Sequence, residues 1–164
     1  MNRRAVGYGI YSEPNRRAAV QKAVATGTAA MTARIILMRE DADAEISPQF
    51  GVLLVQPTFD LSQDISTPAA RAAAINVLLV AAFRMGDLMD SVLARQSIVQ
   101  DNGLDVRLFE AQTAHPERLL FASDTVVDGP REFTSSISLY GRDWTFQITG
   151  ARVQSGAVNA SSPM

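Results

Sequence analysis

The sequence predicts an α+β fold, in which helices pack beside an antiparallel β-sheet. Short apolar segments of strand length follow one another with few helices between them, which favours antiparallel pairing over a parallel sheet. Near the end of the chain, two such segments are separated by a tight turn at Gly141. Hydrophobic residues make up 47% of the 164 residues, so one domain of ordinary size can bury a core.

The first predicted element is a helix that begins near Ser12 and continues to about Thr26. Ser12 is a good capping residue, and Pro14 is tolerated in the first turn of a helix. Gly27 ends the helix, because glycine readily adopts the left-handed conformation found after a last turn.

The later segments predict strands and two further helical pieces. A second helix begins at Gly86, and Leu88, Met89, Val92 and Leu93 form its buried face. Pro57 is expected to close the second strand. The predicted strands cover 32–39, 51–56, 75–84, 104–111, 119–122, 133–140 and 144–148, with a helical turn at 68–74 and exposed loops at 41–45 and 59–67.

Composition excludes several classes of function. The net charge of −2 gives no global attraction to nucleic acid or anionic lipid. The chain has no cysteine and a single histidine, His115, so thiolate and multi-histidine metal sites are excluded and no cofactor is expected. No apolar run reaches the roughly 18 to 20 residues of a transmembrane helix, and no signal peptide precedes the first element.

Several short motifs occur in the order known from one family. They are Gly7-Tyr8, Ser12-Glu13-Pro14, Arg16-Arg17, Thr26-Gly27, Thr32 with Ile35 and Leu37, Gly51 with Leu53 and Pro57, Ala82-Phe83-Arg84 with Leu88, the Leu-Leu-Phe-Ala-Ser segment at 119–123, and Gly141-Arg142 with Trp144. Over about residues 5–150, this ordered set resembles the ligand-binding half of a CHASE domain.

The resemblance implies a PAS-like antiparallel sheet with flanking helices. CHASE domains are extracytoplasmic sensory parts of membrane-bound histidine kinases and of cyclic-nucleotide or cyclic-di-GMP enzymes. Residues 1–152 would then be a PAS-like ligand-binding lobe without its stalk helix, and 153–164 a disordered tail. The domain itself would not be an enzyme. Its parent would be a membrane-anchored kinase or diguanylate cyclase of a two-component type, homodimeric, with this lobe on the periplasmic side of the inner membrane.

A PAS-like pocket would lie between the sheet and the helices that cover it, and alternate strand residues share a face. Plant members place a purine-anchoring acid before an arginine on the first helix, where this chain has Arg16. A cation there suits an anionic ligand, and Arg34 is the second candidate cation for it. The candidate ligand-binding residues are Arg16, Arg34, Ile36, Met38, Leu53, Val55, Leu78, Val80 and Phe83.

Each candidate also has an ordinary structural role. The apolar residues could simply form a core, Arg34 could point outward and pair with Glu40 or Asp41, and Arg16 could lie on a solvated face of its helix. Asp41, Asp43 and Glu45 lack the glycine and the final glutamate of a calcium-binding loop. Two functions therefore remain open. One is a small-molecule sensor, and the other is a dimerisation or periplasmic protein-interaction module that binds no metabolite.

Overall fold

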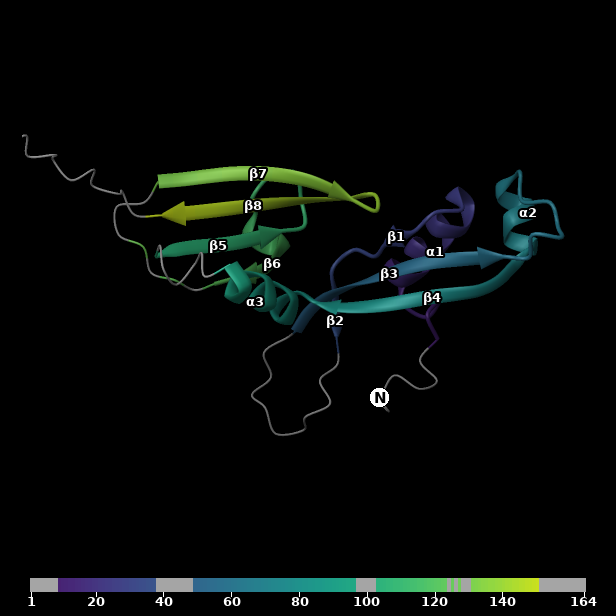
Figure 1. Ribbon diagram of the computed structural model, residues 1–164, viewed down its shortest axis with the longest axis horizontal. Helices are drawn as coiled ribbons and strands as arrows, with labels where there is room; N and C mark the ends of the chain where they lie inside the picture. Colours follow the sequence, from purple (N-terminus) through teal and green to yellow (C-terminus); the bar gives the residue numbers. More distant parts are fainter. Residues whose placement is uncertain are drawn as a thin grey trace, which may run out of the picture.

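The chain folds into two four-stranded antiparallel sheets with helices packed around them, as seen in a computed structural model that describes residues 9–37, 49–96, 103–123, 125, 127 and 131–150. This confirms the α+β class and is consistent with the PAS-like fold that the resemblance implies. The strands form two sheets where one was expected. The sheets lie end to end and give the molecule an elongated shape (Figure 1).

Sheet A and sheet B use successive parts of the chain. Sheet A contains β1 (Ala30–Met31), β2 (Ile35–Leu37), β3 (Gln49–Phe59) and β4 (Ile75–Arg84). Sheet B contains β5 (Leu104–Phe109), β6 (Leu119–Ala122), β7 (Arg131–Leu139) and β8 (Arg142–Gly150) in the order β6-β5-β8-β7. The helices are α1 (Pro14–Thr26), α2 (Pro68–Ala73), α3 (Met85–Gln96) and the 3-10 turn η2 (Pro116–Arg118).

Helix α1 has the predicted length but a different cap. The carboxylate of Glu13 accepts hydrogen bonds from the backbone N–H groups of Asn15 (2.9 Å) and Arg16 (2.8 Å), so Glu13 is the N-cap. Ser12, which was expected to fill that role, donates instead to the Gly9 carbonyl at 2.6 Å. At the other end Gly27 has φ of 73° and caps the helix as predicted.

Strand β3 is the centre of sheet A. Strand β4 pairs along one side of it, while β1 and β2 share the other side. The predicted continuous strand from Thr32 is broken there, because Thr32 uses its side chain in the ladder. Its N–H donates to the Leu53 carbonyl, and its Oγ1 accepts from the Leu53 N–H, both at 2.9 Å.

Pro57 lies inside β3 and does not end it, contrary to expectation. Backbone groups of alternate strand residues point to the same side. The bonds between Leu53 and Thr32 therefore place the backbone nitrogen of Pro57 on the β1 side as well. Strand β1 pairs only as far as Val55, so the missing N–H of Pro57 breaks no ladder bond.

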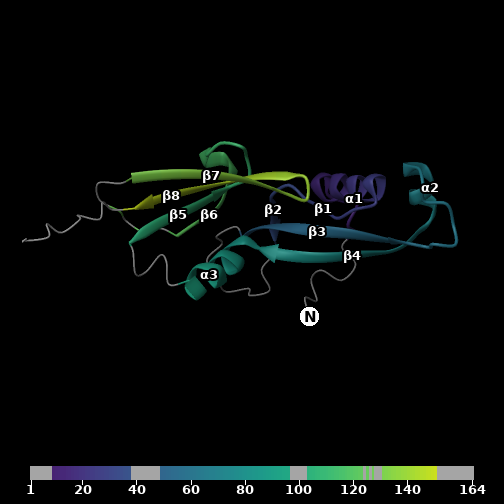
Figure 2. The same cartoon turned by 45° about the horizontal axis from the view of Figure 1, so that its top comes forward.

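Two cores hold the elements together, and they lie on opposite faces of sheet A. Helix α1 packs on one face, while α3 lies on the other face, beside sheet B (Figure 2). In α3, Met89 is buried as predicted, whereas Val92 is exposed. The core shared by both sheets and α3 consists of Met31, Val52, Met85, Met89, Val106, Leu108, Leu120, Phe121 and Trp144.

Candidate functional site

Four of the predicted ligand-binding residues lie on one face of sheet A. Strand register pairs Val55 with Val80 and Pro57 with Leu78, and Leu53 lies two residues before Val55. Helix α1 covers this face, and Val55 is completely buried against it. Val80 lies nearer the edge and is 46% exposed. The centre of the predicted pocket wall is therefore packed core, and only its outer border reaches solvent.

Two other predicted residues lie on the opposite face. Ile36 pairs with Phe50, and Phe83 pairs with Val52, so both alternate with the residues that contact α1. Ile36 is mostly exposed, while Phe83 packs against the shared core. Met38 and the acidic run at 41–45 lie outside the described residues. The structure thus does not bring the whole predicted set into one pocket.

Arg34 connects the two sheets. Its Nη1 donates to the Leu119 carbonyl at 2.8 Å, and its guanidinium carbon lies 4.2 Å from the centre of the Phe50 ring. Its backbone N–H donates to Oε2 of Glu110 at 2.9 Å, and Oε1 of the same buried carboxylate lies 2.8 Å from Nη2 of Arg142. Among the described residues the contacts of Arg34 come from sheet B and from Phe50, and its other expected partners, Glu40 and Asp41, lie outside the described residues.

Arg16 lies on the stripe of α1 that faces sheet A, one turn before Val20. It is partly buried, and its backbone N–H is one of those capped by Glu13. Two positions were considered for this side chain, a ligand pocket and a solvated helix face, and its partial burial does not select one of them. It lies on a different turn from Lys22, whose side chain faces the β7–β8 turn.

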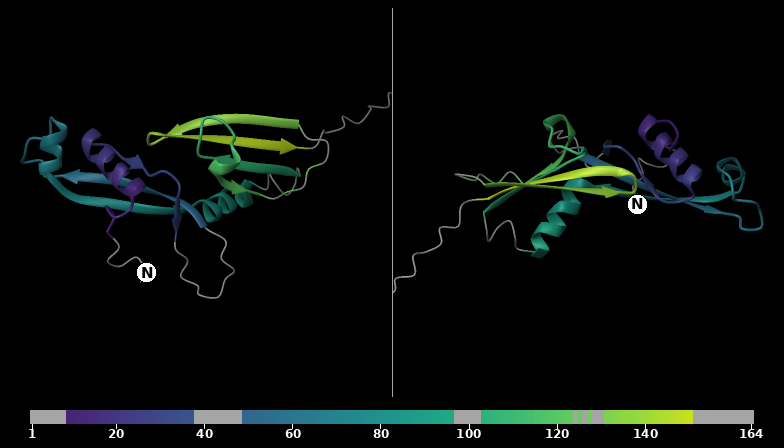
Figure 3. Two further views of the ribbon diagram at one scale, coloured as in Figure 1. Left: turned by 180° about the vertical axis from the view of Figure 1, so that it is seen from behind. Right: turned by 90° about the horizontal axis from the view of Figure 1, so that it is seen from above.

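The tip of the β7–β8 hairpin lies beside α1 (Figure 3), and a groove lies between them. It is open to solvent and has a volume of about 560 Å³. Residues from α1, the segment after it, β3 and the hairpin turn line it: Lys22, Thr26, Gly27, Thr28, Ala29, Gln56, Tyr140 and Gly141. None of these was a sequence candidate. The one available signal was that Lys22 is the only lysine in the chain.

The hairpin turn is held in the groove by two hydrogen bonds. The Met31 N–H donates to the Tyr140 carbonyl, and Nζ of Lys22 donates to the Gly141 carbonyl, both at 3.2 Å. Tyr140 and Gly141 have φ of 49° and 77°, as required at both central residues of a two-residue type I′ turn. A tyrosine with positive φ is uncommon, so the turn presents this ring at some conformational cost.

The groove combines a cation, hydroxyl groups and an aromatic ring. Lys22 uses one of its three N–H donors on Gly141, so two are left for another acceptor. The hydroxyls of Thr26 and Thr28 lie 2.9 Å apart on the same wall. Tyr140 is half exposed and can stack on a flat ligand. This chemistry suits a small anionic molecule with a planar or apolar part.

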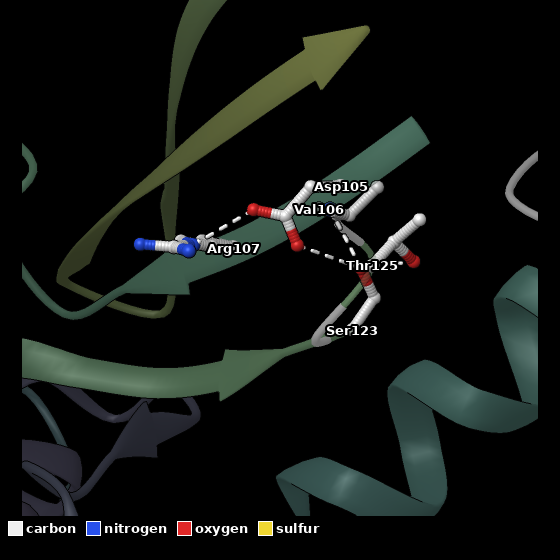
Figure 4. A network of polar contacts seen from close by, with 5 residues as sticks. All are labelled: Asp105, Val106, Arg107, Ser123 and Thr125. Carbon is white, nitrogen blue, oxygen red and sulfur yellow. Dashed lines mark hydrogen bonds and ion pairs between the residues drawn. The ribbon is translucent and has the colours of Figure 1, made fainter. Parts of the chain in front are cut away.

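A second polar cluster lies within sheet B (Figure 4). The buried carboxylate of Asp105 accepts from Nε of Arg107 at 2.8 Å and from Oγ of Ser123 at 3.0 Å. The same Oγ accepts from the Val106 N–H at 2.9 Å and lies 3.3 Å from Oγ1 of Thr125. Each oxygen of the carboxylate has a partner, so this network fastens the end of β6 to β5 and offers no activated nucleophile.

Other functional chemistry is not built into the part of the chain that the structure describes. His115 caps η2, accepting from the Glu117 N–H at 3.4 Å. No group of three His, Cys, Asp or Glu residues comes together within the described ranges to hold a metal ion. Among the described helices, none is long and apolar enough to cross a membrane.

Comparison with known proteins agrees with the resemblance read from the motifs. The model of the CHASE domain family matches residues 1–121, which is most of the chain and extends through Phe121 in β6. No curated protein matched the sequence. CHASE domains are extracellular, sensory and non-catalytic, in agreement with the expectation that this domain is not itself an enzyme. The chain therefore belongs to the CHASE domain family.

Proposed function

We propose that this domain senses a small anionic molecule that binds in the groove between α1 and the β7–β8 turn. The observation that carries the proposal is the position of Lys22. Its ammonium group lies in a hollow of about 560 Å³ and has donors left after its bond to Gly141. A carboxylate could accept from Lys22 while the rest of the molecule lies against the Tyr140 ring.

The location of the groove suggests how binding could become a signal. One wall belongs to α1 and sheet A, and the other is the tip of sheet B. A ligand that touches both walls would favour one relative position of the sheets over others. In a membrane-bound parent, that bias would pass from the periplasmic side to a cytoplasmic histidine kinase or nucleotide cyclase.

Lys22 takes the anion-binding role first considered for Arg16 and Arg34. Nη1 of Arg34 is bonded to the Leu119 carbonyl, and its guanidinium lies on Phe50. Removing these contacts to bind a ligand would weaken the connection between the sheets. Lys22 can bind an acid by adding a partner to its existing bond, which needs no such loss.

A panel of small carboxylic acids and their uncharged amides tests this proposal by thermal shift and calorimetry. An acid at 100 times its dissociation constant should stabilise the fold by about 2.7 kcal/mol. Lys22→Gln should weaken binding at least tenfold, as expected when a charge-assisted hydrogen bond is lost. Arg131→Gln is the matched control, because Arg131 is an exposed cation at the far end of β7. Equal binding by both variants, or no response to any acid, would reject the proposal.

The second candidate function is an interaction module that binds no metabolite. Two observations favour it. The α1 face of sheet A is filled around Val55, and apolar side chains are exposed along β4, including Val77, Leu79 and Val80. A domain that responds to no ligand but changes its association state when β4 is altered would support this alternative.

A further inference from the structure

Strand β4 is a long apolar edge strand, with no neighbour on its outer side among the residues that the structure describes. Among the described strands it pairs only with β3. Eight of its ten residues are apolar, and only Asn76 and Arg84 are polar. Leu79 is 56% exposed and Val77 is 47% exposed. Natural edges of this length are normally protected by lysine, proline or a bulge along the outer side, because free N–H and C=O groups invite another strand to pair.

The direction of the free backbone groups follows from the rest of the sheet. Leu53 directs its N–H and C=O toward Thr32, away from β4. Ala82 lies directly opposite Leu53 in the ladder. Because two opposed residues either bond to each other or both point away, Ala82 directs its N–H and C=O groups to the outer side of β4. By the alternation of strand residues, Leu78 and Val80 do the same. The outer edge therefore presents evenly spaced donors and acceptors centred on Val80.

This edge is complementary to itself. In an antiparallel pair of two β4 strands that overlaps from Asn76 to Arg84, Val80 lies opposite Val80 of the second copy. On either side of that point, Leu79 lies opposite Ala81 and Leu78 opposite Ala82, so a large side chain meets a small one on both faces of the sheet. At the ends, Arg84 lies opposite the neutral Asn76, and no like charges meet. All outward backbone groups pair in this register, giving about ten inter-strand hydrogen bonds.

We infer that two copies of this domain pair through β4, in antiparallel fashion about a two-fold axis at Val80. Sheet A then continues across the interface. Helix α1 packs chiefly over β3, which leaves the outer side of β4 accessible. A second copy is the favoured occupant because one register satisfies the backbone, the side-chain sizes and the charges together. The inference does not depend on the groove or on any ligand.

The absence of native cysteine allows a direct cross-linking test. In the proposed register the two Val80 Cα atoms are roughly 5.5 Å apart, within the span of a disulfide of about 4.4 to 6.8 Å. Val80→Cys should form a covalent dimer under mild oxidation. Ile137→Cys, at a comparably exposed apolar position on β7, should not. Cross-linking at Ile137 alone, or at neither position, would overturn the inference.

Association in solution gives the second measurement. The unaltered chain should sediment as a dimer that dissociates on dilution. Val80→Lys places two ammonium groups opposite each other and should weaken dimerisation at least 100-fold, with an unchanged circular dichroism spectrum. Ile137→Lys is the control and should leave the dimer intact. A chain that is monomeric at all concentrations, or a dimer lost only in Ile137→Lys, would contradict pairing through β4.

Discussion

The two sheets end in edge strands of similar length but opposite character. Both β4 and β7 are exposed over much of their length. Six of the nine residues in β7 are Arg, Glu, Ser or Thr, whereas two of the ten in β4 are polar. Polar side chains keep β7 hydrated and discourage another strand from pairing, while β4 has no such protection.

The faces of the sheets differ in the same way. Sheet A buries apolar residues on both faces, against α1 on one side and against the shared core on the other. Sheet B has one apolar face in the shared core and carries polar networks through Asp105, Glu110 and Thr145. Sheet B therefore buries several polar groups within hydrogen-bonded networks, whereas sheet A leaves apolar side chains of β4 exposed for further contacts.

The largest predicted effect concerns the core that joins the sheets. Leu108 is completely buried in sheet B, whereas Leu139 on β7 is 37% exposed. Leu108→Ala should lower the free energy of unfolding by about 2–5 kcal/mol, because it removes buried methyl groups and leaves a cavity. Leu139→Ala should change it by about 0.5 kcal/mol or less. Urea denaturation measures both, and equal losses would mean that the sheets do not depend on this core.

The next effect concerns the arginine that links the sheets. Arg34→Ala should cost about 1–2 kcal/mol, because it removes the bond to the Leu119 carbonyl and the contact with Phe50. Arg107→Ala is the matched control. Arg107 is about half exposed, and the buried Asp105 keeps its bond from Ser123 when Arg107 is removed, so the loss should cost at most about 1 kcal/mol. A larger loss for Arg107 would show that the contact within sheet B outweighs the link between the sheets.

A smaller effect is expected at the hairpin turn. A Cβ at Gly141 would lie 2.1 Å from Nζ of Lys22, and φ there is 77°. Gly141→Ala should therefore destabilise the fold by about 1 kcal/mol and displace Lys22 from the groove. Gly86 in α3 has nothing within 4 Å of its Cβ position, so Gly86→Ala should be neutral or slightly stabilising. Thermal unfolding of the two variants distinguishes these outcomes.

The smallest effect concerns one exposed carboxylate in each half of the molecule. Hydrogen bonds from Gln63 and Ser62 lower the pKa of Asp60, and those from Ser138 and Gln112 lower the pKa of Asp143. Such a carboxylate stabilises the folded state at pH values above 3.8, which is its pKa in the unfolded chain. This contribution is lost as the pH falls through the lower pKa of the folded state. In an NMR titration, both groups should titrate below 3.8. A midpoint at or above 3.8 for either group would show that its hydrogen bonds do not persist in solution.

Local sequence signals predicted the individual elements well. The bounds of β4 and β6 agree with the segments read from the sequence, and α1 ends at Gly27 as its left-handed cap requires. Errors occurred where two neighbouring residues could play one role. Ser12 and Glu13 are both able to cap α1, and only the local geometry selects Glu13.

Features that depend on distant pairing were not accessible from the sequence. The division into two sheets depends on β5 pairing with β8 across a long separation, and an alternating pattern carries no information about its partner. The groove is built from α1, β3 and the hairpin turn, which meet only in the folded chain. Arg34 was recognised as a residue that needs a partner, but the Leu119 carbonyl that provides it is 85 positions away.

Pro57 limits pairing along one side of β3. A polypeptide laid beside β3 beyond Val55 would find no amide hydrogen at Pro57, so this stretch of β3 lacks a donor that a further strand would need. The outer side of β4 contains no proline, so every residue there keeps its amide hydrogen. One ring-locked residue thus makes the two ends of the same sheet unequal as templates for an additional chain.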